Sequence, residues 1–173
     1  MDALRQRKTL REVSGEKLPI QLLSNLLWAG FGINRPEIAH RTAPSAMNAQ
    51  EIDVYVASAD GLYLYNALSN RLESVLASDV RGKTSGQDFA KIAPVTLIFV
   101  ADYARMAKAK PEQKDVYAGI DTGFISQNVY LFCASEGLAT VVHDLDRLVL
   151  SKAMPLRPDQ HIVLAQAVGF PKK

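Results

Sequence analysis

The stretch Pro94-Val-Thr-Leu-Ile-Phe-Val-Ala101 is apolar at almost every position and shows no alternation between polar and apolar residues. Its β-branched and aromatic side chains favour a strand. A strand without polar alternation is typical of the centre of a sheet that is covered on both faces. We therefore expect residues 94–101 to form a central strand in the core.

Strand patterns also occur before and after this run. Residues 51–58 alternate between polar and apolar positions, and Asp60-Gly61 predicts a tight hairpin into a second strand over Leu62–Asn66. Further short strands are expected at 71–76, 141–142 and 162–168. The pattern is mixed, neither purely helical nor purely strand.

Helices are indicated where apolar residues recur every three or four positions. The first is expected over Pro19–Ala29, with the proline in its first turn and Gly30 and Gly32 ending it. A long helix is expected from about Gln113 to Glu136, closed by a glycine at 137. Shorter helical segments are expected at 87–92 and 145–154. Because the long helix is apolar around much of its circumference, we expect it to pack against a second copy of the chain.

The composition excludes several classes of protein. With 173 residues, of which 48% are hydrophobic, the chain can bury a complete core, and one domain over residues 1–173 is expected. A net charge of +2 is too small to indicate a nucleic-acid surface. The longest apolar stretch is far shorter than a membrane span, and no signal-peptide region follows Met1. We therefore expect a cytoplasmic protein without a membrane partner, although a chain trimmed of an export signal would look the same.

Cysteine and histidine give no sign of a metal centre. Cys133 is the only cysteine, so a disulfide framework within the chain is excluded, and its apolar surroundings predict that it is buried. The histidines at 40, 143 and 161 do not have metal-ligand spacing. We expect no metal site.

A long irregular stretch between Gly30 and Asn48 ends in the segment Arg41-Thr-Ala-Pro-Ser-Ala-Met-Asn-Ala-Gln50. Its small residues and proline leave backbone amides open to a flat ligand, and Ser45 adds a short polar side chain. Irregular stretches of this length are more often functional than idle. Taken alone, the segment also fits an ordinary turn.

Cations gather at both ends of the chain. Arg7-Lys-Thr-Leu-Arg11 lies near the N-terminus, and Lys172 and Lys173 end the sequence. If the fold brings the termini together, these residues form one anion site; otherwise they are solvated tails. With the segment that ends at Gln50, they suit a phosphorylated, planar cofactor.

Four sequence blocks stand in a recognisable order: Arg7–Arg11, Arg41–Gln50, Asp121–Asn128 with the helix running on to Gly137-Leu-Ala-Thr, and Val168–Pro171 followed by lysine. Together they resemble the nitroreductase superfamily of FMN-dependent oxidoreductases, and more closely the single-domain relatives of its SagB-type dehydrogenase branch. The resemblance implies a three-layer α+β fold, with a central, mainly antiparallel sheet flanked by helices, in a homodimer.

The resemblance also implies which N- and C-terminal residues would bind FMN. Arg7 and Thr9 would contact its phosphate, helped by Lys172 or Lys173, since cations and hydroxyl groups form charge-assisted bonds with phosphate oxygens. Lys8 could serve either the phosphate or the ring.

The flavin ring would be contacted from three other segments. Arg11 would lie near its N1 and O2 edge, where a cation stabilises the reduced ring. Pro44, Ser45 and Ala46 would pack along the isoalloxazine and ribityl groups, and Asn48 would bond the pyrimidine edge or ribityl hydroxyls. The segment that includes Val141, Val142 and His143 would face N5 and O4. Whether an amide or a side chain approaches N5 stays open, because some relatives have Glu-Gly after this point and this chain continues with His143-Asp-Leu.

The implied activity is transfer of hydride from NAD(P)H through flavin N5 to a small-molecule acceptor such as a nitro compound or a quinone, without a catalytic acid or base. One alternative is a flavin-dependent dehydrogenase of SagB type, and another is a flavin-binding or storage protein without turnover. No residue pattern in the sequence identifies the physiological substrate or distinguishes NADH from NADPH as the donor.

Other residues keep two interpretations each. His143 could donate to a substrate or be structural, and Arg41 could bind an acidic substrate group or form a surface salt bridge. Asp121 could line a pocket or face a partner subunit, and Tyr130 could belong to the core or to an interface. Trp28 is expected in the core because it follows the leucine period of its helix.

Overall fold

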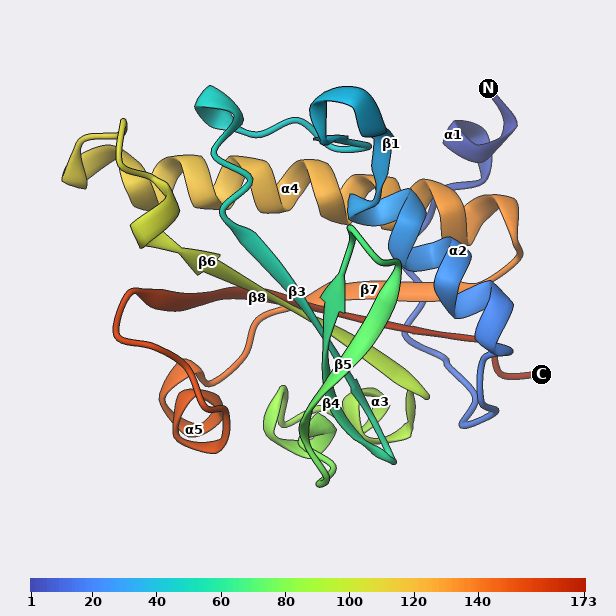
Figure 1. The fold of residues 1–173 in the computed structure, drawn as a ribbon. Helices are drawn as coiled ribbons and strands as arrows, with labels where there is room; N and C mark the ends of the chain where they lie inside the picture. The colour runs from blue at the N-terminus through green and yellow to red at the C-terminus, as the bar shows by residue number, and fades with distance from the viewer.

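Strand β6 (Val95–Asp102) lies in the middle of the sheet, and all eight of its residues are buried. The computed structural model describes residues 1–173. The sheet has six strands in the order β5, β4, β3, β6, β8 and β7, and every neighbouring pair is antiparallel (Figure 1). The other strands are β3 (Ile52–Ser58), β4 (Gly61–Asn66), β5 (Arg71–Leu76), β7 (Ala139–His143) and β8 (Gln160–Gly169). The predicted central strand and mainly antiparallel sheet are confirmed.

The hairpin predicted from Asp60-Gly61 joins β3 to β4, where Ser58 pairs with Gly61. Gly61 has a φ of 147°, and a Cβ at this position would lie 2.4 Å from the carbonyl oxygen of Leu76. Both observations require glycine here. The turn therefore fixes the register of the two strands.

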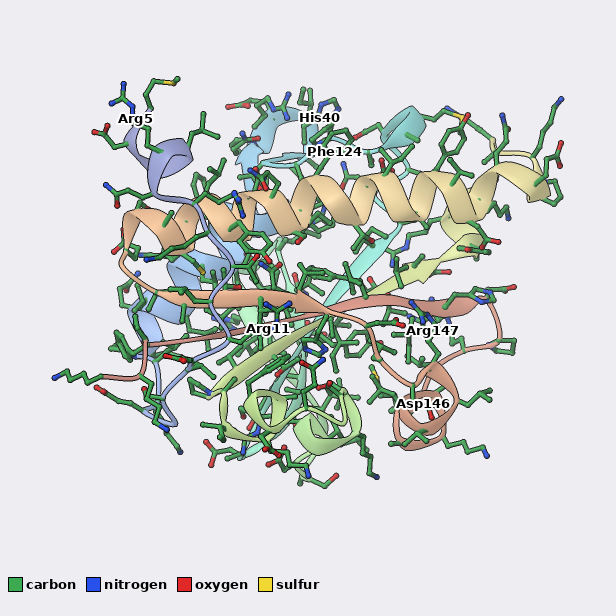
Figure 2. The ribbon with its side chains drawn as sticks, turned by 180° about the vertical axis from the view of Figure 1, so that it is seen from behind. Arg5, Arg11, His40, Phe124, Asp146 and Arg147 are labelled. Carbon is green, nitrogen blue, oxygen red and sulfur yellow. The ribbon has the colours of Figure 1, made fainter.

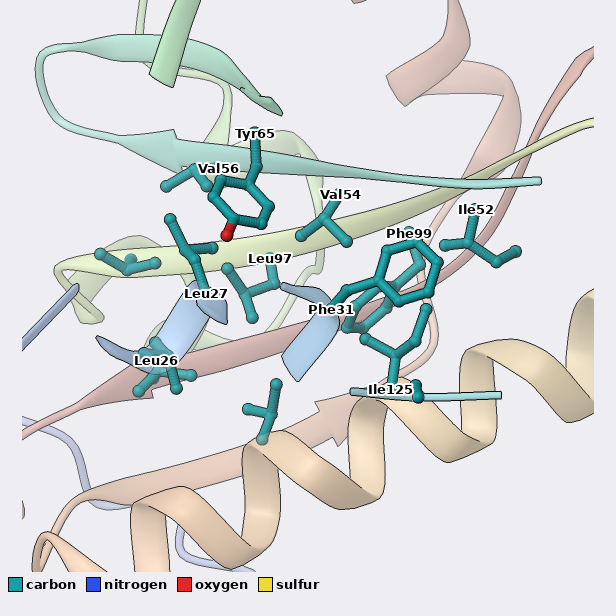
Figure 3. Close-up of a cluster of buried hydrophobic side chains, with 14 of the residues drawn as sticks. Leu26, Leu27, Phe31, Ile52, Val54, Val56, Tyr65, Leu97, Phe99 and Ile125 are labelled. Carbon is teal, nitrogen blue, oxygen red and sulfur yellow. The ribbon is translucent and has the colours of Figure 1, made fainter. Parts of the chain in front are cut away.

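Helices cover both faces of the sheet, as a three-layer α+β fold requires (Figure 1). On one face lie α2 (Ile20–Phe31) and α4 (Pro111–Ser135). Their apolar residues pack with side chains of β3 and β6, including Val54, Leu97 and Phe99 (Figure 3). The short helices α3 (Asp88–Ile92) and α5 (Arg147–Ala153) pack against the other face.

The prediction that Gly30 ends the first helix is wrong. The helix α2 continues through Gly30 to Phe31 and is capped by Gly32. A Cβ on Gly30 would lie 3.1 Å from a methyl carbon of Val129 on α4. This glycine lets the two helices approach each other closely, and its effect on packing outweighs its low helix propensity.

Two further expectations about helices are corrected. Helix α5 begins at Arg147 and not at residue 145, because the carboxylate of Asp146 accepts hydrogen bonds from the amides of Leu148 and Val149 at its start. Trp28 is 46% exposed and not in the core, and its indole N–H donates to the carbonyl of Ile33 at 3.2 Å.

Short elements occur where the sequence predicts none. They are α1 (Asp2–Gln6), the two-stranded sheet of β1 (Ile33–Arg35) and β2 (His40–Arg41), and the 3-10 turns η1 (Pro36–Ile38), η2 (Ala46–Asn48), η3 (Arg81–Lys83) and η4 (Tyr103–Arg105). The stretch between Gly30 and Asn48 is therefore partly ordered by backbone pairing. None of the helices has the length and apolar character that a membrane crossing requires.

Candidate functional site

The N-terminal and C-terminal segments of the chain lie side by side. The amide of Lys172 donates to the carbonyl of Glu12 at 3.0 Å, and the amide of Ser14 donates to the carbonyl of Phe170 at 2.8 Å. Earlier in the N-terminal segment, the amide of Leu10 donates to the carbonyl of Thr140, on the edge strand β7, at 3.0 Å. Backbone bonds thus fix both basic segments against the same end of the sheet, which is the condition that a shared anion site requires.

None of the cations in these two segments forms an ion pair with a carboxylate. The five are Arg7, Lys8, Arg11, Lys172 and Lys173. We call them the terminal cations. Cations without a carboxylate partner are free to bind an anion.

Two cavities flank the N-terminal segment. The first, of about 400 Å³, lies against α4 and β7 and is lined by Lys8, Tyr130 and Thr140 among others. The second, of about 500 Å³, lies against α3 and is lined by Arg11, Lys172 and Phe89 among others. Of the terminal cations, Lys8 therefore lines one cavity, and Arg11 and Lys172 line the other.

Tyr130 on α4 joins the basic segment to β7. Its hydroxyl lies 3.2 Å from the hydroxyl oxygen of Thr9 and accepts a hydrogen bond from the amide of Val142 at 3.0 Å. The guanidinium of Arg7 lies over its ring, 5.4 Å from the centroid. Sequence reasoning did not assign Tyr130 to the site, and no local signal reveals it, since Thr9 and Tyr130 are 121 positions apart.

The side chain of His143 lies on the face of β7 that packs against α3, opposite the face that packs against α4. It is 5% exposed, and its ring makes an edge contact with Phe89 at a centroid distance of 5.2 Å. Burial lowers the pKa of His143, so the neutral ring is favoured near neutral pH. Its Nδ1 lies 3.2 Å from the carbonyl of Asp144, whereas Nε2 has no partner in the protein. This ring nitrogen is itself buried, and His143 reaches the cavity of Arg11 only through Phe89, which lines that cavity.

The turn at Pro44–Asn48 lies elsewhere on α4. Met47, Asn48 and Gln50 have φ values of 54°, 53° and 48°, a left-handed conformation that costs a non-glycine residue of the order of 1 kcal/mol. The turn is held by the hydroxyl of Ser45, which accepts from the amide of Gln50 at 2.9 Å. It is also held by the carboxylate of Asp121, which accepts from the amide of Ala46 at 2.7 Å.

Arg41 supports this turn and forms no salt bridge, which was one of the two interpretations of this residue. Its guanidinium donates to the side-chain oxygen of Gln50 at 2.8 Å and to the carbonyl of Phe31 at 2.9 Å. It also stacks 4.2 Å from the centroid of the Phe31 ring. Burial and the nearby Arg105 lower the pKa of Arg41. The side chain is therefore used inside the protein.

Within one chain, the turn and the terminal cations are apart. The turn contacts α4 at Asp121 and the basic segment contacts it at Tyr130, nine residues later, which is about 13 Å along a helix. Figure 2 shows Arg5 at one end of α4, His40 and Phe124 above its middle, and Arg11 over the sheet. The structure does not bring all of the predicted FMN contacts together in a single copy.

An exposed apolar stripe runs along α4 beside the turn. Val116, Ile120 and Phe124 follow one another at four-residue steps and are 58%, 48% and 45% exposed. Gly119 and Gly123 lie between them, and a Cβ at either position would meet open space. We call these five residues the α4 stripe. This is the surface that the predicted self-association needs, because it is apolar and lets a second helix approach closely.

Comparison with known proteins identifies relatives over nearly the whole chain. The model of the nitroreductase family matches residues 4–170. A protein of Methanocaldococcus jannaschii that is named as a nitroreductase is 31% identical over 150 residues, which are 81% of this chain and 75% of the relative.

Solved structures agree with this assignment. A crystal structure of a protein from Ralstonia eutropha JMP134, named as a nitroreductase, has a TM-score of 0.95 and 40% identity, covering 100% of this chain and 83% of the other. A similarly named protein from Desulfovibrio desulfuricans, solved in complex with FMN, has the same fold with a TM-score of 0.68 and 23% identity, covering 99% of this chain and 85% of the other. The chain belongs to the nitroreductase family.

Proposed function

We propose that the chain is an FMN-dependent oxidoreductase that passes hydride from NAD(P)H to a small-molecule acceptor such as a nitro compound or a quinone. The observation that carries this proposal is the set of terminal cations, which lack carboxylate partners and are fixed by backbone bonds at one end of the sheet. The solved complex of a family member with FMN supports the choice of cofactor.

In this proposal the phosphate of FMN is bound by Arg7 and Thr9, with Lys172 or Lys173. Charge-assisted hydrogen bonds of this kind contribute roughly 1.5–3 kcal/mol each. Tyr130 holds Thr9 and Arg7 in place through its hydroxyl and its ring. Lys8 lines the cavity against α4 and β7, and its charge can act on either the phosphate or the ring of FMN.

The ring of FMN is placed beside Arg11 and the free edge of β7. When bound, FMN would supply the hydride chemistry, and the chain would supply position and charge. Arg11, which lines the cavity beside Phe89, favours negative charge on the cofactor, and the buried ring of His143 packs against Phe89 on the same side of β7. No side chain needs to act as a general acid or base in this scheme.

We further propose that the site is shared between the subunits of a homodimer. The α4 stripe supplies an apolar surface for the contact, and the Pro44–Asn48 turn lies next to it on the same helix. A second copy packed on this stripe would add Pro44, Ser45, Ala46 and Asn48 to the site of the first copy. The measurement is light scattering, which should give about twice the chain mass of 19.0 kDa. Phe124→Asp should shift the protein toward the mass of one chain, because it places a charge in the apolar contact; Leu148→Asp, at an exposed position on α5, should not.

The cofactor is tested by the visible absorption of the purified protein, followed by release of the bound molecule and determination of its mass. Flavin absorption and the mass of FMN are expected, and addition of NADH or NADPH should bleach the absorption. A colourless protein that stays colourless after addition of FMN would contradict the proposal. A bound flavin that no nicotinamide reduces would favour either the SagB-type dehydrogenase or the flavin-binding protein without turnover.

A further inference from the structure

Glu51 is a fully buried glutamate immediately before β3, with 0% of its surface exposed. Neither oxygen of its carboxyl group has a hydrogen-bond donor as a partner. A buried carboxylate without a donor is costly, so the group favours its protonated form. This environment, with Asp121 nearby, raises the pKa of Glu51 to about 7.

Arg105 does not neutralise Glu51. Arg105, the cation that acts on Glu51, directs its guanidinium to other groups. It donates to the carbonyl of Gln50 at 3.0 Å and forms ion pairs with Asp53 and Asp102. Glu51 is therefore left without an ion pair of its own.

Asp121 on α4 is the group that faces the carboxyl of Glu51 and can accept its proton in a hydrogen bond. Asp121 is itself only 2% exposed, and two buried carboxylates that meet cannot both be ionised without a large cost. The carboxylate of Asp121 also accepts a hydrogen bond from the amide of Ala46 in the Pro44–Asn48 turn, at 2.7 Å. A line of contacts thus leads from Glu51 through Asp121 to the turn.

We propose that Glu51 and Asp121 share one proton, and that this proton holds the Pro44–Asn48 turn in the position that binding of FMN requires. Glu51 is then a positioning residue. Its proton donates to Asp121, which stays oriented to accept from the amide of Ala46. Loss of the proton to solvent places two negative charges together and weakens this support. The second part of the proposal rests on the proposed function, whereas the first part does not.

The sign of the pH dependence follows from the direction of the shift. Because the pKa of Glu51 is raised in the folded chain from 4.5 to about 7, the folded protein keeps a proton that the unfolded chain loses. The stabilisation is fully present below about pH 4.5 and is lost as the pH rises through about 7. The charged or titratable groups that act on Glu51 are Asp121 from α4 and Arg105 from η4, and Glu51 in turn raises the pKa of Tyr103 on η4.

The first test uses the protein without flavin. We would measure Tm between about pH 5 and about pH 8 for the wild type, for Glu51→Gln and for the control Glu16→Gln, which changes an exposed glutamate. Glutamine keeps a donor for Asp121 at every pH, so the Tm of Glu51→Gln should rise relative to wild type as the pH increases. The control should follow the wild type. A difference between wild type and Glu51→Gln that does not change with pH would overturn the shared proton.

An infrared measurement keeps the test decisive if Glu51→Gln does not fold. The wild type should show the carboxyl band of a protonated acid at about pH 6, where ordinary carboxyl groups are ionised, and should lose it above about pH 8. Absence of such a band at about pH 6 would overturn the proposal.

The second test measures the affinity for FMN through flavin fluorescence at about pH 6 and about pH 8. Between these two pH values, the affinity of the wild type for FMN should fall by up to about tenfold for each unit by which bound FMN raises the pKa of Glu51. Titration of the FMN phosphate affects all variants equally and cancels in their ratio, so Glu51→Gln should show a smaller fall than wild type and Glu16→Gln. An equal fall in all three would overturn the link to the turn. If no variant binds FMN, the proposed function fails, while the measurements without flavin still decide the shared proton.

Discussion

The two ends of strand β8 carry charged residues in opposite arrangements. Near its start, Asp102 is bonded by both Arg105 and Arg157, and Asp53 accepts from Arg105 and from Gln160. Near its end, the terminal cations have no carboxylate partners. The first arrangement is complete within the protein and stabilises the fold. The second has no negative charge within the chain, and in the proposed function the phosphate of FMN supplies it.

The largest effect should come from Asp102→Ala, which breaks the ion pairs near the start of β8; we call this the paired end, and the end with the terminal cations the unpaired end. The side chain of Asp102 is 6% exposed, and its loss leaves Arg105 and Arg157 without a shared partner and the amide of Ala104 without an acceptor. The free energy of unfolding should fall by roughly 3 kcal/mol. Urea denaturation measures this, and Asp159→Ala, at an exposed position, should change it by less than about 0.5 kcal/mol. Equal effects of the two changes would contradict a structural role for the paired end.

At the unpaired end, Arg11→Ala should separate binding from stability. Loss of one charge-assisted contact should weaken FMN binding by roughly tenfold to a hundredfold, since such a contact contributes about 1.5–3 kcal/mol. The free energy of unfolding without flavin should not fall, because Arg11 has no ion pair to lose. Titration with FMN and urea denaturation measure the two quantities, with Lys152→Ala on α5 as the control cation. A loss of stability without a loss of affinity would show that Arg11 is structural.

Inorganic phosphate should stabilise the protein without flavin if Arg7 and a C-terminal lysine bind the phosphate group. At ten times its Kd, phosphate adds about 1.4 kcal/mol, which corresponds to a rise in Tm of about 3–5 °C. The change should be smaller in Arg7→Ala, and chloride at matched ionic strength should not reproduce it. Identical shifts with both anions would mean that the effect is general screening of charge.

The smallest effect is expected for Tyr130→Phe, which removes one hydroxyl and keeps the ring. The amide of Val142 loses its acceptor and Thr9 loses its contact, so the free energy of unfolding should fall by about 1 kcal/mol. FMN should bind about fivefold more weakly, because Thr9 is no longer held in place. Phe132→Leu, at another partly buried aromatic residue of α4, should leave FMN binding unchanged. If Tyr130→Phe also leaves binding unchanged, Tyr130 does not position the site.

The comparison of sequence and structure shows which features are encoded locally. The hairpin at Asp60-Gly61 and the buried run of β6 are correctly predicted, because turn chemistry and hydrophobic pattern act over a few residues. Gly30 is misinterpreted as a helix stop, because its packing against Val129 depends on a helix that lies about a hundred positions later. The exposed position of Trp28 likewise depends on how α2 sits on the sheet.

The same limit applies to the site. The blocks that resemble the nitroreductase superfamily identify the basic segment and the turn, but the supporting contacts join distant parts of the chain. Tyr130 meets Thr9 across 121 positions, and Asp121 meets Ala46 across 75. Glu51 carries no signal of its unusual state in its sequence neighbourhood, because its burial and the use of Arg105 by other groups arise only in the fold.

The central claim is that Arg7, with Lys172 or Lys173, binds the phosphate of the cofactor. Titration of the flavin-free protein with FMN and with riboflavin tests it most directly, because the two molecules differ only in that phosphate. If two charge-assisted contacts form, FMN should bind at least about a hundredfold more tightly than riboflavin at low salt, and the advantage should shrink as salt is added. Equal affinities for FMN and riboflavin would contradict the account.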